Sequence, residues 1–153
     1  MKEITFSDNP APITKKIVVI GAQGMLGQEI VSCIGNEHTV IAPTRQECDL
    51  TNWTLVEKFF SKLKLYDVIV NCAAFTKVDE CEADGKNAFA INSAGSQILA
   101  KCAEKIKIPI VQISTDYVFD GKSNFYTTTS PTSPINVYGR SKLLGEQYVK
   151  TIA

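Results

Sequence analysis

Residues 15–30 read KKIVVIGAQGMLGQEI, and this stretch decides the class of fold. Its aliphatic run, residues 17–20, is typical of a strand that is buried on both faces, as in a parallel sheet. Three glycines, Gly21, Gly24 and Gly27, follow where such a strand must turn into a helix. The stretch therefore predicts a strand–turn–helix unit with a glycine-rich turn.

Each of these glycines suits a phosphate site. Gly21 permits a tight turn, Gly24 leaves the backbone bare for a pyrophosphate, and Gly27 lets the new helix lie close to the strand. The helix N-terminus offers free N–H groups and partial positive charge. The G-x-x-G-x-x-G spacing is one residue longer than the standard dinucleotide fingerprint. The pattern indicates a dinucleotide site, and a glycine-rich turn that binds nothing is the alternative.

The size and charge of the chain limit its organisation and partners. Its 153 residues suit one domain with a real core. Sixteen basic residues balance sixteen acidic ones, so we expect neither nucleic acid nor a membrane surface as a partner. Residues 1–14 lack the apolar run of a signal peptide and are expected to be a loose lead-in. Residues 15–153 are expected to form the domain.

Cysteine and histidine usage points to a reduced compartment without a metal site. The odd number of cysteines and the lack of a C-x-x-C pair predict free, mostly buried thiols in a cytoplasmic protein. The five are Cys33, Cys48, Cys72, Cys81 and Cys102. The only histidine, His38, has no ligand cluster around it, so no metal is expected.

Strand and helix patterns alternate along the chain. The predicted strands are residues 15–20, 39–42, 66–71 and 108–114, and the predicted helices are residues 25–34, 53–63, 85–105 and 138–153. Repeated strand–helix pairs imply right-handed crossovers and a parallel sheet. The sequence thus predicts an α/β doubly wound parallel sheet of the Rossmann type, with strand order 3-2-1-4. The inward face of the third helix is predicted to carry Ala88, Ile91, Ala94, Ile98, Leu99 and Cys102.

Ligands of such sheets bind at the carboxyl ends of the strands. After the second strand comes Arg45, which can pair with a 2′-phosphate and favours NADPH. Glu47 lies at the usual sequence distance from the glycines for an acidic residue that binds the adenosine ribose, but it falls beyond the end of the second strand. After the third strand, Ala73 and Ala74 have small side chains that let a cofactor pass close to the backbone. Ordinary loops are the alternative at both ends.

The end of the fourth strand and the last helix carry acid–base chemistry. Thr115 and Asp116 follow the strand, and Tyr138 and Lys142 lie one turn apart on the helix. A nearby ammonium favours the phenolate of a tyrosine, whose ordinary pKa is about 10. Thr115 can donate a hydrogen bond to a carbonyl that the tyrosine also contacts. A tyrosine–lysine pair on a helix surface is the alternative, which the order of the motifs disfavours.

Together these motifs resemble the dTDP-4-dehydrorhamnose reductase family of extended short-chain dehydrogenase/reductases. The motifs are G-x-x-G-x-x-G at 21–27, D-L at 49–50, N-C-A-A-F-T-x-V-D-x-x-E at 71–82, S-T-D-Y-V-F-x-G at 114–121 and N-V-Y-G-x-x-K at 136–142. The resemblance implies reduction of the 4-keto group of a nucleotide-linked deoxysugar by NADPH or NADH.

The resemblance also implies roles for single residues. Tyr138 would protonate the substrate oxygen, and Lys142 would hold the cofactor ribose and tune Tyr138. The implied sites are Thr115, Tyr138 and Lys142 for catalysis, Asp116 for substrate, Gly24, Met25 and Leu26 for the pyrophosphate, Asp49 and Leu50 for adenine, and Ala73 and Ala74 for the nicotinamide-side ribose.

Some features depart from the family. Its members usually carry a histidine in place of Phe75 and acidic residues in place of Thr128 and Ser130. The chain has about half the family's length, so we expect either a fragment holding the cofactor-binding half or a shortened relative. Such a piece is expected to bind cofactor but to turn over substrate poorly. The uncovered edge beyond the fourth strand favours self-association, and a homodimer is one expected state.

Two other functions stay open on sequence alone. A sugar-nucleotide epimerase or dehydratase shares the fold, but a dehydratase needs a glutamate beside the catalytic hydroxyl residue, where Asp116 stands here. A non-catalytic NADP-binding regulatory subunit, like the methionine adenosyltransferase β subunit, also resembles this family. Retention of Thr115, Tyr138 and Lys142 favours the reductase.

Overall fold

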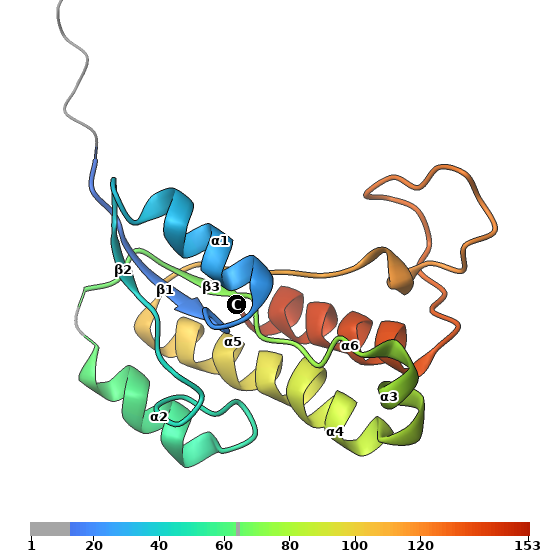
Figure 1. Ribbon diagram of the computed structural model, residues 1–153, viewed down its shortest axis with the longest axis horizontal. Helices are drawn as coiled ribbons and strands as arrows, with labels where there is room; N and C mark the ends of the chain where they lie inside the picture. Colours follow the sequence, from blue (N-terminus) through green and yellow to red (C-terminus); the bar gives the residue numbers. More distant parts are fainter. Residues whose placement is uncertain (1–12, 64) are drawn as a thin grey trace, which may run out of the picture.

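The computed structural model describes residues 13–63 and 65–153 (Figure 1). It contains a parallel sheet of four strands, which confirms the predicted doubly wound α/β fold. The strands are β1 (Lys16–Ile20), β2 (Thr39–Ile41), β3 (Val68–Asn71) and β4 (Ile110–Gln112). All four are shorter than predicted, and β4 differs most. Most of the predicted lead-in, residues 1–12, lies outside the described residues.

The strand order is β2-β1-β3-β4, so the predicted order 3-2-1-4 is wrong. Strand β3 pairs with β1, with Ile69 opposite Val18, rather than with β2. The reason lies in residues 43–52, which form turns and bury Cys48 and Leu50 in the core. The chain therefore crosses back over β1 before it forms its next strand. The order reverses between β1 and β3, and their carboxyl ends make the crevice where such sheets bind ligands.

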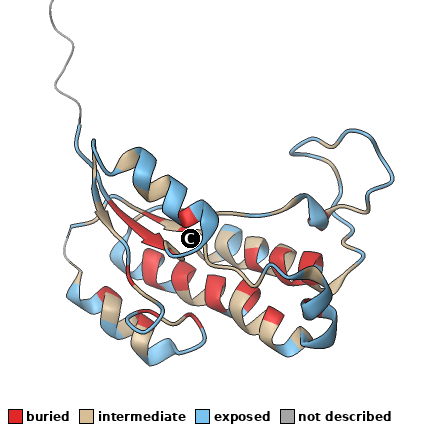
Figure 2. Cartoon of the chain, viewed as in Figure 1, coloured by how far each residue is buried: buried red, intermediate tan, exposed pale blue. Residues whose placement is uncertain are grey.

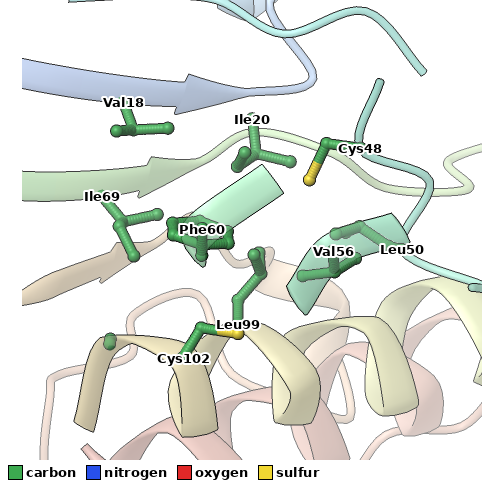
Figure 3. Close-up of a cluster of buried hydrophobic side chains, with 10 residues drawn as sticks. Val18, Ile20, Cys48, Leu50, Val56, Phe60, Ile69, Leu99 and Cys102 are labelled. Atoms are coloured by element: carbon green, nitrogen blue, oxygen red, sulfur yellow. The ribbon is translucent and has the colours of Figure 1, made fainter. Parts of the chain in front are cut away.

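The main core lies between the sheet and the helices α2 (Trp53–Lys62) and α5 (Gly95–Ile106). Figure 3 shows side chains of the strands facing those of the two helices. The buried members are Val18, Ile20, Cys48, Leu50, Val56, Phe60, Ile69, Leu99, Cys102 and Ala103. Each large aliphatic or aromatic side chain contributes about 1.5–3 kcal/mol on burial. This core fixes the strand ends that carry the glycine turn.

The opposite face of the sheet carries α1 (Met25–Ile34), as Figure 1 shows. Gly27 is the buried residue of this helix, and Leu26 is 44% exposed. On β4, Val111 is 48% exposed. Figure 2 shows the contrast between the pale blue outer surface of α1 and the buried residues along α5.

The third predicted helix is unbroken, but part of it is π-helical rather than α-helical. It consists of α4 (Gly85–Phe89), a π-helical turn η1 (Ala90–Ala94) and α5. A π-turn inserts one extra residue and rotates the helical faces of the residues after it. Ala94, predicted to face inward, is therefore exposed. The polar residues Asn92, Ser93 and Ser96 are buried instead.

The helix α6 (Val137–Ile152) begins one residue before the predicted start. Its N-cap Asn136 accepts a hydrogen bond from Gly139 N at 2.7 Å. The short helix α3 (Val78–Ala83), which the sequence patterns do not predict, packs against this start, and Cys81 and Tyr138 share a buried cluster there. Its six residues are too few to give a periodic signal. This packing fixes the first turn of α6.

All five cysteines have free thiols, and three of them, Cys48, Cys81 and Cys102, are buried. Cys72 is half-buried and Cys33 is exposed. Within residues 13–63 and 65–153, no helix is long and apolar enough to cross a membrane. The same described residues contain no group of three or more His, Cys, Asp or Glu placed to hold a metal ion.

Candidate functional site

The turn after β1 needs glycine at Gly21 for reasons internal to the fold. Its φ is +77°, and a Cβ there would lie 2.5 Å from Ala73 N. Gly24 differs, because its backbone is extended and a Cβ would meet only Gly21 O at 3.4 Å. The fold therefore leaves room for a side chain at Gly24. A ligand that approaches the backbone closely explains a glycine at this position.

Helix α1 starts at this turn with a bare N-terminus. Gly24 is its N-cap, and no side chain of the described residues caps it. Met25 is 91% exposed, so its side chain does not cover the helix end. The first N–H groups of a helix without such a cap can bind an anion. This arrangement suits a phosphate group.

A cleft of about 230 Å³ lies at the carboxyl ends of β1 and β3. Seven of the predicted cofactor residues line it: Gly21, Gly24, Arg45, Asp49, Leu50, Ala73 and Ala74. The thiols of Cys48 and Cys72 also line it, and burial raises the pKa of Cys48 to about 12. Burial also raises the pKa of Cys72, so both thiols are neutral, and the charged residues that line the cleft are Arg45 and Asp49.

Arg45 and Asp49 form an ion pair at the far end of the cleft, with 3.1 Å between Nε and Oδ2. Burial acts to raise the pKa of the Asp49 carboxyl, but hydrogen bonds from Thr51 and from the Arg45 guanidinium outweigh it and hold the pKa below its ordinary value. The Arg45 side chain is 70% exposed. The carboxylate of Glu47 instead accepts hydrogen bonds from Thr44 N and Oγ1, so it is engaged in its own turn.

Tyr138 and Lys142 lie on the inner face of α6. Tyr138 is 8% exposed and Lys142 is 3% exposed. The ammonium of Lys142 donates to Ile113 O at 2.5 Å. The ring of Tyr138 meets that of Tyr117 edge-on, with 5.5 Å between centroids. Both predicted catalytic side chains are therefore held in fixed positions beside the end of β4.

The electrostatics of this pair differ from the sequence prediction. Burial raises the pKa of Tyr138 above its ordinary value, and the neighbouring hydroxyl of Thr115 offsets part of that shift. Burial likewise lowers the pKa of Lys142, although the carboxylate of Glu146 opposes this. The predicted lowering of the phenol pKa is wrong for this structure, because the burial of Tyr138 outweighs its favourable contacts and raises the pKa instead.

Thr115 and Asp116 lie at the start of the short helix η2 (Asp116–Val118). The Thr115 hydroxyl accepts a hydrogen bond from Tyr117 N at 3.2 Å and faces Tyr138. Asp116 lines a separate hollow of about 240 Å³, which Phe119 also lines. The structure thus brings Thr115 to the tyrosine and gives Asp116 a place in an adjoining hollow.

Two contacts that the sequence did not reveal connect the parts of this site. Asn92 donates from Nδ2 to Ser141 Oγ at 2.9 Å, between Tyr138 and Lys142 on α6. Glu82 of α3 accepts a hydrogen bond from Val137 N at 2.6 Å. The signal for the first was a polar residue, Asn92, four residues after Ala88 and therefore on the face of the helix predicted to be apolar. The second rests on residues 55 positions apart, which no local pattern brings together.

Comparison with known proteins gives a consistent result. A dTDP-4-dehydrorhamnose reductase of Mycolicibacterium smegmatis is 39% identical over 140 residues, which are 90% of this chain and 42% of that protein. A crystal structure of a dTDP-4-dehydrorhamnose reductase of Clostridium acetobutylicum superposes with a TM-score of 0.84 at 43% identity, over 90% of this chain and 49% of that one.

A second solved structure, the dTDP-4-dehydrorhamnose reductase of Bacillus anthracis in complex with NADP, has a TM-score of 0.87 at 32% identity. It is matched over 92% of this chain and 50% of that one. The chain therefore spans about half the length of these relatives. The family model described as the RmlD substrate binding domain matches residues 15–153, and the chain belongs to this family.

Proposed function

We propose that this chain is the cofactor-binding part of an NAD(P)H-dependent reductase of the dTDP-4-dehydrorhamnose reductase type. Its substrate would be a nucleotide-linked deoxysugar with a keto group at carbon 4. The observation that carries this proposal is the cleft at the switch point between β1 and β3, which unites seven predicted cofactor residues from separate segments of the chain. The names of the similar reductases and the NADP complex of the Bacillus anthracis protein support it.

The residues of the cleft fit a dinucleotide. The bare backbone at Gly24 and the first N–H groups of α1, at Met25 and Leu26, would bind the pyrophosphate. Gly21 and Gly27 keep this turn close to the sheet. The other predicted contacts are Asp49 and Leu50 for adenine, Arg45 for a 2′-phosphate, and Ala73 and Ala74 for the nicotinamide-side ribose. When bound, the cofactor supplies a hydride.

The side chains of α6 and η2 would handle the proton. A reduction requires a proton for the oxygen of the keto group, and the phenol of Tyr138 is the donor in this proposal. The phenol is protonated at neutral pH and so has a proton to donate, while its raised pKa makes it a weaker acid than an ordinary tyrosine. Thr115 would hold the same oxygen through its hydroxyl. Lys142 would bind the ribose hydroxyls, and Asp116 would contact the sugar from its hollow.

The remaining parts of the proposal concern partners and location. The nucleotide-sugar substrate follows from the reaction. A homodimer is proposed because, within the described residues, β4 is the outermost strand of the sheet and its free edge can pair with a second copy. A cytoplasmic location is proposed from the five free thiols. The regulatory-subunit alternative is not favoured, since Thr115, Tyr138 and Lys142 are all present and the similar proteins are reductases.

Calorimetric titration of the 153-residue chain with NADPH and with NADH tests the cofactor part. We expect saturable binding of at least NADPH with one site per chain, and competition between the two dinucleotides. Lack of binding of either dinucleotide by the folded chain would overturn the proposal. Oxidation of NADPH with dTDP-4-keto-6-deoxy-L-mannose by the longest native form of the protein, compared between wild type and Tyr138→Phe, tests the assignment of the proton donor; equal rates would overturn it.

A further inference from the structure

Lys142 presents an electrostatic problem that its nearest partner does not solve. The residue is 3% exposed, and its ammonium donates to the carbonyl oxygen of Ile113. A carbonyl carries only a partial charge, and a buried ammonium without a full counter-charge tends to lose its proton. Another group near Lys142 must therefore favour the charged form if Lys142 is to act as a cation.

Glu146 lies one turn after Lys142 on the same face of α6. It is the only acidic residue of this helix. Its carboxylate accepts a hydrogen bond from the hydroxyl of Ser114, the residue that follows Ile113. Lys142 and Glu146 thus bind consecutive residues at the end of β4. Ser114 thus holds the carboxylate at the strand end that the ammonium of Lys142 also reaches.

The other titratable groups around Lys142 are neutral at neutral pH. Cys72, which follows β3, is the second group that influences Lys142, and burial raises the pKa of its thiol. Burial also raises the pKa of Tyr138, one turn earlier on α6. Glu146 is consequently the anion that faces Lys142 from the elements packed around it. Its carboxylate opposes the effect of burial, which lowers the pKa of Lys142.

We propose that Glu146, held in place by Ser114, is a positioning residue that keeps Lys142 in its ammonium form. The importance of this role rests on the proposed function, in which Lys142 binds the cofactor ribose as a cation. The contact itself does not depend on that function. Two readouts therefore test separately the effect of Glu146 on the protonation of Lys142 and the role of Lys142 in cofactor binding.

The first readout is the protonation of Lys142 without any cofactor. The full chain is labelled with ¹³C at the lysine ε-carbon, and each lysine is titrated by NMR, with Lys142 assigned from the signal that Lys142→Met removes. In Glu146→Gln, which keeps the shape and the acceptor oxygen, we expect the pKa of Lys142 to fall below its wild-type value. Ser114→Ala should lower it in the same direction but by less.

Glu80→Gln is the matched control. Glu80 pairs with Lys77 on the surface of α3, with 2.8 Å between Nζ and Oε1. The control should lower the pKa of Lys77 and leave that of Lys142 unchanged. An unchanged pKa of Lys142 in folded Glu146→Gln would overturn the proposal. Should that variant fail to fold, an unchanged pKa of Lys142 in Ser114→Ala would overturn it equally.

The second readout is the pH dependence of NADPH affinity. In wild type the affinity should fall as Lys142 loses its proton. In Glu146→Gln this fall should move to lower pH by the same interval as the NMR titration. A shifted NMR titration with a chain that never binds NADPH would sustain the Glu146–Lys142 pairing and overturn the proposed function. Equal pH profiles in wild type and variant, with binding intact, would overturn the proposal for Glu146.

Discussion

The side-chain amide of Asn92 hydrogen-bonds both backbone polar groups of Phe75. Phe75 N donates to Oδ1 at 2.7 Å, and Nδ2 donates to Phe75 O at 3.0 Å. The same Nδ2 reaches Ser141 on α6. Asn92 therefore links the loop after β3, which lines the cleft, to the helix that carries Tyr138. The π-helical turn makes this possible, because it directs Asn92 inward.

Replacement of Asn92 should loosen this link. Asn92→Ala leaves the N–H of Phe75 without its acceptor, leaves the C=O of Phe75 with only the weak thiol donor of Cys81, and removes one of the two partners of the Ser141 hydroxyl. We expect a loss of about 1–3 kcal/mol in the free energy of unfolding. Urea denaturation measures it, and NADPH affinity should fall because the loop at Ala73 and Ala74 is released. Gln147→Ala, an exposed substitution on α6, is the control. Equal stability of Asn92→Ala and the control would contradict this assignment.

Much of the fold follows from local patterns. The aliphatic run at 17–20 and the three glycines predict β1, its turn and α1, because burial on both faces and a sharp turn each demand particular residue types. The strand order does not follow in the same way, because residues 43–52 have no pattern that separates a strand from a set of turns. Only their packing, with Cys48 and Leu50 in the core, decides it.

The sequence predicts which residues lie at the candidate site better than it predicts their pKa values. Tyr138, Lys142 and the cleft residues come from motifs of fixed spacing. The raised pKa of Tyr138 depends on burial by segments far away in sequence, such as α3 with Cys81. The roles of Asn92 and Glu82 likewise require contacts with α6, which lie 49 and 55 residues away. Sequence patterns carry no information on such distances.

Gly24→Val should abolish dinucleotide binding with little effect on the fold. The extended backbone of Gly24 accepts a β-branched residue, and a Cβ would meet only Gly21 O at 3.4 Å. The side chain would instead fill the volume that a pyrophosphate needs. We expect NADPH affinity to fall about 100-fold or more, equivalent to ~2.8 kcal/mol. Calorimetry measures the affinity, and thermal unfolding checks the fold.

Ser32→Val places the same side chain on the exposed surface of α1 and serves as the control for Gly24→Val. It should bind NADPH as the wild type does. Unchanged affinity in folded Gly24→Val would show that the cofactor does not pass over this turn.

Arg45→Ala should reduce the preference for NADPH. The guanidinium is 70% exposed beside the cleft and is free to turn from Asp49 toward a 2′-phosphate. Its removal should weaken NADPH binding about tenfold, equivalent to ~1.4 kcal/mol, and leave NADH binding nearly unchanged. The exposed ion pair with Asp49 adds little stability, so unfolding should hardly change. Arg140→Ala, at the other arginine of the chain, should alter neither affinity. Equal losses for both cofactors in Arg45→Ala would argue against contact with the phosphate.

Lys142→Met should stabilise the fold at neutral pH while it removes the proposed function. Burial holds the pKa of Lys142 below its ordinary value, so the charged side chain destabilises the folded state relative to the unfolded one. At a pH between the folded-state pKa of Lys142 and the ordinary lysine pKa, the unfolded state binds more protons than the folded state. The free energy of unfolding of the wild type therefore rises with pH relative to that of the variant. The advantage of Lys142→Met should therefore be complete below the folded-state pKa and should shrink as the pH approaches the ordinary lysine value.

The measurement is the free energy of unfolding of wild type and of Lys142→Met across this pH range. Titratable groups that both proteins share cancel when one value is subtracted from the other. Lys101→Met, at an exposed lysine of α5, is the control and should show no such dependence. A loss of stability in Lys142→Met that is constant with pH would mean that the hydrogen bond to Ile113 O outweighs the cost of burying the charge. A gain that fades with rising pH would show that the fold tolerates an unfavourable buried cation at this position, as expected where a side chain serves binding rather than stability.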